Sequence, residues 1–103
     1  MKIQSDIKSE VETKISAFNR QHKCKYVARY KGKFLYLDRV SGFLGSLSPV
    51  FRLTFSGDIE SCDFAIYKFS TGNYDSEEWF FPGSEHVDGT IEGAMLAGLE
   101  AYT

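Results

Sequence analysis

The run CKYVARYKGKFLYLDRV, beginning at Cys24, constrains the fold more than any other part of the sequence. Two strand-like segments flank Lys31-Gly32, and a glycine that can take positive φ is typical of a tight β-hairpin. A two-residue loop here sets Tyr30 opposite Lys33 and fixes the remaining pairs, including Lys25 with Asp38. The sequence therefore predicts an antiparallel sheet that has one apolar face.

Apolar residues in the first 22 positions recur at steps of four, four, four and three, which draws one stripe along a helix. The stripe consists of Ile3, Ile7, Val11, Ile15 and Phe18. We predict a helix from about Ile3 to His22 that packs on the chain's own sheet.

A second helix is predicted at the end of the chain. Its apolar stripe consists of Ile91, Met95, Leu99 and Tyr102, and Asp88 is placed to cap its first turn. Gly93 and Gly98 lie inside this helix, where each glycine costs about 1 kcal/mol relative to alanine. That cost indicates a close approach of the helix backbone to another part of the molecule.

Between the hairpin and the last helix, the pattern predicts strands at Val50–Ser56 and Asp63–Ser70, with a loop over residues 71–89. We therefore expect one α+β domain over residues 1–103, in the order α-β-β-β-β-α. It would be a four-stranded antiparallel β-meander with the N-terminal and C-terminal helices packed on one face.

The composition excludes some classes of protein. No apolar run approaches the roughly 18 residues of a membrane helix, and the N-terminus lacks the hydrophobic block of a signal peptide. We expect a cytoplasmic monomer or homodimer that has no membrane partner and keeps Cys24 and Cys62 as free thiols. Residues 1–52 carry eleven Lys and Arg against four Asp and Glu, whereas residues 53–103 carry one against ten. Mutual neutralisation of the halves is the favoured explanation, and a basic face for an anionic partner is the alternative.

Basic and aromatic residues are predicted to share the sheet face opposite the helices. This set consists of Arg29, Phe34, Tyr36, Arg52 and Lys68. Stacking surfaces beside cations are what sheet platforms use to bind single-stranded nucleic acid. The competing interpretation is that the acidic and aromatic loop folds back over this face and covers it. The covering residues would be Asp75, Glu77, Glu78, Trp79, Phe80 and Phe81.

The same loop holds His86 among carboxylates, and these groups suit metal binding or general-base catalysis. Their spacing matches no established metal, phosphate-loop or nucleophile motif. We therefore expect no cofactor and no metal, and we favour a binding role over an enzymatic one. Asp88 has a simpler role as the helix cap.

The segments FAIYKFS and YDSEEWFFPGSEHVDGTIEGAMLAGLEAY resemble a small prokaryotic domain family of unknown function, over residues 24–102. The resemblance implies a stand-alone domain and transfers no site residue. Our leading hypothesis is a non-catalytic module that binds a partner through the loop 74–88, with a protein as one candidate partner. The expected contact residues are Trp79, Phe80, Phe81 and His86, with nucleic-acid binding and a small enzyme or metal site around His86 as alternatives.

Overall fold

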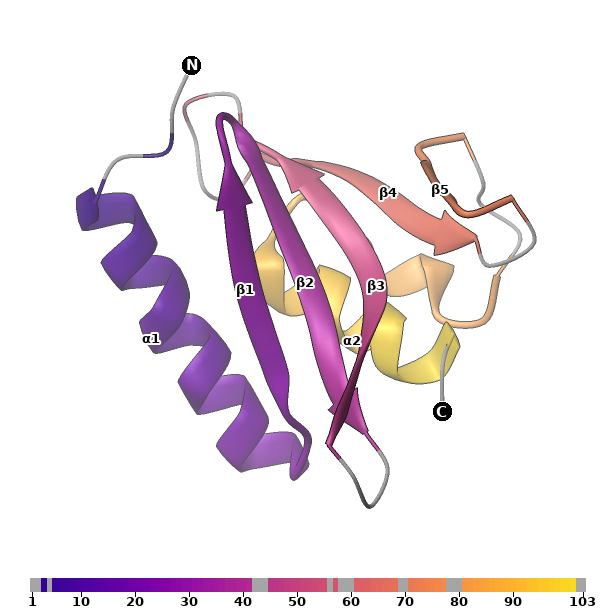
Figure 1. Ribbon diagram of the computed structural model, residues 1–103, viewed down its shortest axis with the longest axis horizontal. Helices are drawn as coiled ribbons and strands as arrows, with labels where there is room; N and C mark the ends of the chain where they lie inside the picture. Colours follow the sequence, from indigo (N-terminus) through magenta and orange to yellow (C-terminus); the bar gives the residue numbers. More distant parts are fainter. Residues whose placement is uncertain are drawn as a thin grey trace.

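A computed structural model of the protein describes residues 3, 5–41, 45–55, 57, 61–68, 71–77 and 81–101. Five strands pair antiparallel in chain order, and two helices pack on one face of the sheet (Figure 1). Helix α1 lies beside β1, and α2 crosses behind the sheet. The elements are α1 (Ser5–His22), β1 (Tyr26–Lys31), β2 (Phe34–Ser41), β3 (Ser46–Thr54), β4 (Asp63–Lys68), β5 (Asn73–Asp75), the 3₁₀ helix η1 (Ser84–His86) and α2 (Ile91–Ala101).

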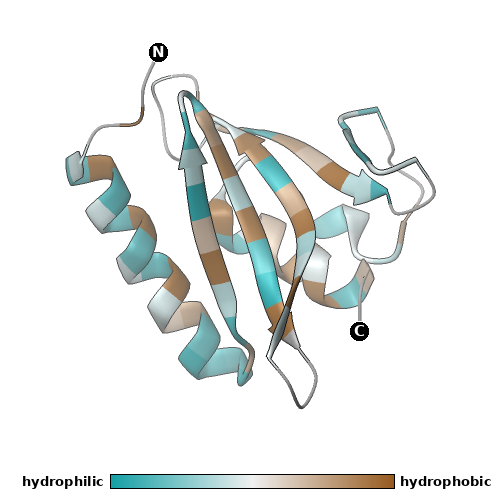
Figure 2. Cartoon of the chain, viewed as in Figure 1, coloured by the Kyte–Doolittle hydropathy of each residue, from teal (hydrophilic) through white to brown (hydrophobic). Residues whose placement is uncertain are grey.

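The hydrophobic core lies between the sheet and the two helices. Its main residues are Val11, Ile15 and Phe18 from α1, Leu35, Leu37, Phe51, Leu53, Phe64 and Ile66 from the sheet, and Ile91, Ala94 and Met95 from α2. Figure 2 shows the alternation of hydrophobic and hydrophilic residues along β2 and β3 that one buried face requires. The neighbours Val50 and Phe51 are both buried, because the β2–β3 register shifts after Leu37 as in a β-bulge.

The α+β class and the antiparallel meander are confirmed, but the sheet has five strands and not four. The fifth strand, β5, lies inside the predicted loop 71–89, and three residues are too few to give a readable alternation. Strand β3 begins at Ser46, four residues before the predicted start at Val50.

The hairpin register differs by two residues from the predicted one. Lys31 pairs with Phe34, so Gly32 and Lys33 form the loop, with Gly32 at φ 60°. Positive φ at the first of two loop positions is the arrangement of a type II′ turn. A shift of two keeps every side chain on its predicted face, but the predicted Lys25–Asp38 ion pair is wrong.

Helix α1 begins at Ser5, two residues after the predicted start. The backbone N–H of Ile3 donates a hydrogen bond to the carbonyl of Gly32 at 3.1 Å, and the Ile3 side chain is buried. Ile3 thus belongs to the core without belonging to the helix. Cys24 and Cys62 are not joined in a disulfide. Within the described ranges, neither helix is long and apolar enough to cross a membrane.

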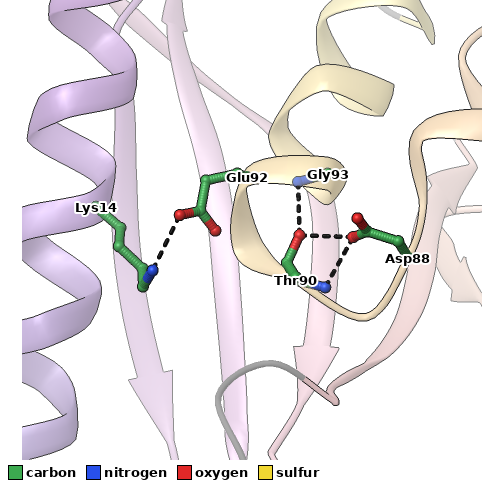
Figure 3. A network of polar contacts seen from close by, with 5 residues as sticks. All are labelled: Lys14, Asp88, Thr90, Glu92 and Gly93. Atoms are coloured by element: carbon green, nitrogen blue, oxygen red, sulfur yellow. Dashed lines mark hydrogen bonds and ion pairs between the residues drawn. The ribbon is translucent and has the colours of Figure 1, made fainter.

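Helix α2 starts from a small polar network (Figure 3). Thr90 Oγ1 accepts a hydrogen bond from the N–H of Gly93 at 3.0 Å, so Thr90 and not Asp88 is the N-cap. Asp88 acts one step earlier, because its Oδ1 accepts from both the N–H and the hydroxyl of Thr90, at 3.0 and 2.6 Å. An ion pair of 3.0 Å between Lys14 Nζ and Glu92 Oε2 then joins α1 to α2.

The predicted close approach to the glycines of α2 is confirmed, and it is intramolecular. A Cβ on Gly93 would lie 2.3 Å from the carbonyl oxygen of His86, and a Cβ on Gly98 would lie 2.5 Å from the Tyr26 hydroxyl. The missing side chains leave room for η1 on one side of the helix and for β1 on the other. Tyr26 uses this room to donate a hydrogen bond of 2.9 Å to the carbonyl of Met95.

Candidate functional site

The sheet face opposite the helices, here called the open face, carries four aromatic rings in contact. Strand alternation places Phe34 and Tyr36 there from β2, Tyr67 from β4 and Tyr74 from β5. The ring centroids lie 6.2 Å apart for Phe34–Tyr36, 5.3 Å for Tyr36–Tyr74 and 5.1 Å for Tyr67–Tyr74. These are separations at which aromatic rings attract each other.

The open face is concave, because side chains from the two edge strands meet across it. In a flat sheet of five strands the edges would lie roughly 19 Å apart, at about 4.8 Å per strand pair. Arg29 of β1 nevertheless places its Nη2 at 3.5 Å from the hydroxyl of Tyr74 in β5. Twist and the bulge in β3 bring the strands into this curve. The concave side is the one that the helices leave open.

Arg29 is held tightly by groups of this face. Its Nε and Nη2 donate to the two carboxylate oxygens of Asp38 at 2.6 and 3.2 Å, and its guanidinium lies 4.9 Å from the Tyr36 ring centroid. Asp38 is buried and needs this partner. The hydrogen bond with Asp38 raises the pKa of Arg29 above its usual value, so the guanidinium stays charged. The pKa of Tyr74 is raised by burial, which keeps its hydroxyl protonated.

Arg52 of β3 has a different environment. Its guanidinium lies between two rings, 4.8 Å from the Phe34 centroid and 5.5 Å from the Tyr74 centroid. The Nε atom is buried and has no hydrogen-bond partner among the described residues. Arg52 is therefore positioned by cation–π contacts and not by a carboxylate.

Two concavities adjoin the open face. The first, about 710 Å³, has the cationic residues Lys8, Arg29 and Lys31 in its wall beside Tyr30, Tyr36 and Tyr74, and none of its described lining residues is acidic. The second, about 530 Å³, is lined by Arg52, Thr54, Asp63 and Ser76 together with apolar residues. The face thus offers aromatic contact area, positive charge and depth.

Four of the five predicted nucleic-acid residues, Arg29, Phe34, Tyr36 and Arg52, meet on the open face. Lys68 does not, because alternation along β4 places it on the side of Phe64 and Ile66. The Nζ of Lys68 lies 3.9 Å from Asp75 Oδ2.

Sequence reasoning missed Tyr74, which contacts Arg29, Arg52, Tyr36 and Tyr67. It was assigned to a loop. One signal in the sequence could have placed Tyr74 in a strand: it follows the turn residues Thr71-Gly72 and is an aromatic residue between two polar ones.

The described part of the loop does not form the predicted cover over the open face. Phe81 packs on the helix side, where it stacks on Phe64 with centroids 5.9 Å apart. Asp75 pairs with Ile66 across the strands and so lies on that side too. Tyr74, by contrast with Phe81, lies on the open face. Two expected contact residues, Trp79 and Phe80, as well as Glu78, lie outside the described residues, so the protein-partner hypothesis that rests on them stays a prediction.

His86 lies against α2, beside one carboxylate of its own loop, Glu85, and one of α2, Glu100. Its Nε2 lies 3.1 Å from Glu100 Oε2, and potential ligand atoms of Glu85, His86 and Glu100 all lie within 4.8 Å of one another. Asp88 is occupied with Thr90, whose hydrogen bonds lower the pKa of its carboxyl. Glu100 was missed because it lies fourteen positions beyond His86, in another element.

No protein-family model, no curated protein and no solved structure matches this chain. The resemblance to a prokaryotic family therefore stays a prediction, and the geometry of the two clusters carries the functional argument.

Proposed function

We propose that the protein is a non-catalytic binding module that holds single-stranded nucleic acid on its open face. The observation that carries this proposal is the meeting of four rings and two guanidinium groups on one concave surface. The adjoining cavity of about 710 Å³, whose charged lining residues are Lys8, Arg29 and Lys31, supports it further.

Each part of this surface suits a part of the proposed ligand. Unpaired bases stack on aromatic rings, which contributes about 1–3 kcal/mol per base. Arginine and lysine neutralise phosphates, and this favours binding whatever the base sequence. Tyr36 and Tyr74 are the central stacking candidates, because their rings contact each other. Tyr36 also contacts the guanidinium of Arg29, and Tyr74 contacts those of Arg52 and Arg29. We infer a short site with weak sequence preference.

Fluorescence anisotropy with a labelled DNA or RNA strand of about ten nucleotides tests the proposal. Affinity should fall steeply between about 50 mM and about 200 mM salt, because bound phosphates release counterions. Tyr36→Ala should weaken binding at least about fivefold, as expected when one stacked base loses its ring.

Arg20→Gln provides the control for charge, because Arg20 is an exposed cation in the last turn of α1 and lines neither of the two concavities described above. It should leave affinity nearly unchanged. An unfolded Tyr36→Ala protein would be recognised by circular dichroism, and Tyr36→Leu then replaces it. Absence of binding at low salt, or equal binding by all three proteins, would reject the proposal.

We also propose, as a second candidate, that Glu85, His86 and Glu100 bind a divalent metal ion. The specific support is the convergence of one imidazole and two carboxylates within 4.8 Å. Imidazole nitrogen and carboxylate oxygen are ligands that Zn²⁺ accepts, and an ion with three protein ligands keeps one position open. Gly83 packs against Glu100, which sets the loop beside the last turn of α2.

Calorimetric titration with Zn²⁺ tests this candidate, and the chain contains a matched control. It has two histidines; His22 lies on α1, where its ring packs on Phe18 at 4.1 Å. His86→Ala and Glu100→Gln should each abolish binding, whereas His22→Ala should retain it. Equal loss in the two histidine variants would indicate unspecific binding.

A further inference from the structure

The two arginines of the open face differ in what their N–H groups contact. Arg29 donates to both oxygens of Asp38, and its Nη2 also lies near the Tyr74 hydroxyl. Arg52 has a buried Nε without a hydrogen-bond partner and no carboxylate within ion-pair distance among the described residues. A buried donor of a charged group that lacks an acceptor is costly. The terminal N–H groups of Arg52 also have no hydrogen-bond acceptor among the described residues, and unlike the buried Nε they can be reached by a ligand.

The contacts of Arg52 also orient it for an anion. The rings of Phe34 and Tyr74 lie 4.8 and 5.5 Å from its guanidinium carbon. Rings beside the guanidinium restrict its motion and leave its N–H groups to face a ligand. The planar fork of an arginine matches two oxygens of a phosphate or carboxylate group.

The cavity of about 530 Å³ beside Arg52 indicates which oxyanion fits. The hydroxyls of Thr54 and Ser76 can donate to it, and Asp63 lies in the same wall. At a given distance, a carboxylate in that wall repels a doubly charged anion twice as strongly as a singly charged one. A phosphodiester, which carries one negative charge, is therefore favoured over a free phosphate or a phosphomonoester, which approach two near neutral pH.

We propose that Arg52 is the phosphate-binding residue of the open face and receives a backbone phosphodiester, whereas Arg29 is a positioning residue that holds Tyr36 and Tyr74. This inference rests on the proposed nucleic-acid function and assigns its phosphate contact. The base next to that phosphate stacks on Tyr74 or Tyr36, since Tyr74 borders Arg52 and contacts Tyr36. Asp63 sets the preference for a singly charged group.

The test measures oligonucleotide affinity against salt for Arg52→Gln and Arg52→Lys, with Arg20→Gln as the matched loss of one cation. Arg52→Gln should bind about tenfold or more weakly at low salt, and its slope of log affinity against log salt should be shallower by about 0.7. Arg52→Lys should recover the slope but not the full affinity, because an ammonium ion lacks the planar fork. Arg20→Gln should match the unaltered protein in both quantities.

Competition by inorganic phosphate and by a nucleoside monophosphate separates the sources of the phosphate. Neither should displace the oligonucleotide from the unaltered protein at millimolar concentration. Asp63→Asn should allow both to compete, and this exposed position gives a result even where an Arg52 variant fails to fold.

The outcomes distinguish the two proposals. Oligonucleotide binding with unchanged affinity and slope in Arg52→Gln would overturn the assignment to Arg52 and leave the proposed function standing. An unaltered protein that binds no oligonucleotide at low salt would overturn both. Displacement of the oligonucleotide from the unaltered protein by free phosphate would refute the preference for a phosphodiester.

Discussion

At the scale of single residues, Thr90 is the position where one side-chain oxygen has the clearest effect on stability. It caps α2 through the N–H of Gly93. Replacing an N-cap threonine with alanine costs about 1 kcal/mol, so Thr90→Ala should lower the free energy of unfolding by about that amount. Urea unfolding followed by circular dichroism measures it.

Thr13→Ala is the matched control for Thr90→Ala. Thr13 is exposed on α1, and its hydroxyl donates to the carbonyl of Ser9 one turn earlier. Alanine has the higher helix propensity, so this variant should be as stable as the parent or slightly more stable. If both variants lost the same stability, the capping role of Thr90 would be wrong.

At the scale of elements, the glycines of α2 reverse the usual effect of a helical alanine. In an exposed helix Gly→Ala stabilises by about 1 kcal/mol. Gly93→Ala should instead destabilise by roughly 1–3 kcal/mol, the usual cost of overpacking. Its Cβ would lie 2.3 Å from the His86 carbonyl oxygen and 2.4 Å from Asp88 Oδ1. Thermal unfolding of Gly93→Ala beside Ser16→Ala, at an exposed site of α1, measures the difference. A stabilised Gly93→Ala would show that η1 can move away from α2.

Gly98→Ala should also destabilise, and here a second substitution provides a check. Its Cβ would lie 2.5 Å from the Tyr26 hydroxyl and 2.7 Å from Val50 Cγ1. Tyr26→Phe removes the first of these contacts. The double variant should therefore lose less stability than the sum of the two single losses, which denaturant unfolding can show.

The helices and strands also show how much of the fold could be predicted from the sequence alone. The stripe of α1 and the alternation around Gly32 are long patterns, and both gave the right faces. The hairpin register was wrong by two residues, since Gly32 serves equally as first or second loop residue, and only the pairing with Phe34 decides. The site was half predictable for a similar reason. Arg29, Phe34, Tyr36 and Arg52 follow from alternation, whereas Tyr74 reaches Arg29 only because the sheet curves, and curvature leaves no period in the sequence.

At the scale of the whole molecule, ion pairs among the described residues form both between and within the basic and acidic halves of the chain. Lys14–Glu92 joins the two halves. Arg29–Asp38 and Lys68–Asp75 each lie within one half. Lys8 and Lys31 line the concavity beside the open face together with Arg29, whose charge is paired with Asp38. A net charge of −2 therefore coexists with a locally basic surface, which is what the proposed ligand requires.

Tyr26 connects the stability of the whole fold to alkaline pH, because it contacts the sheet and both helices. Its ring packs edge-on against Phe18 of α1 and Phe51 of β3, and its hydroxyl donates to Met95 of α2. Burial raises the pKa of Tyr26 above the ordinary value of 10.0. Once pH exceeds that value, the unfolded chain binds fewer protons than the folded one, so the free energy of unfolding falls as pH rises.

The contribution of Tyr26 should thus be complete below about pH 10 and decline above it. Lysines titrate in the same range, so the measurement is the difference in unfolding free energy between the parent and Tyr26→Phe. Urea unfolding at successive pH values should show a constant difference up to about pH 9 and a shrinking one beyond about pH 10. The pKa of Tyr30 is also raised, by burial and by its hydrogen bond to Glu12. Its ionisation lowers the free energy of unfolding of both proteins in the same direction, so it cancels in the difference. Parallel curves over the whole range would mean that the phenol of Tyr26 reaches water before the protein unfolds. The core would then be looser than the contacts of Tyr26 with the sheet and both helices imply.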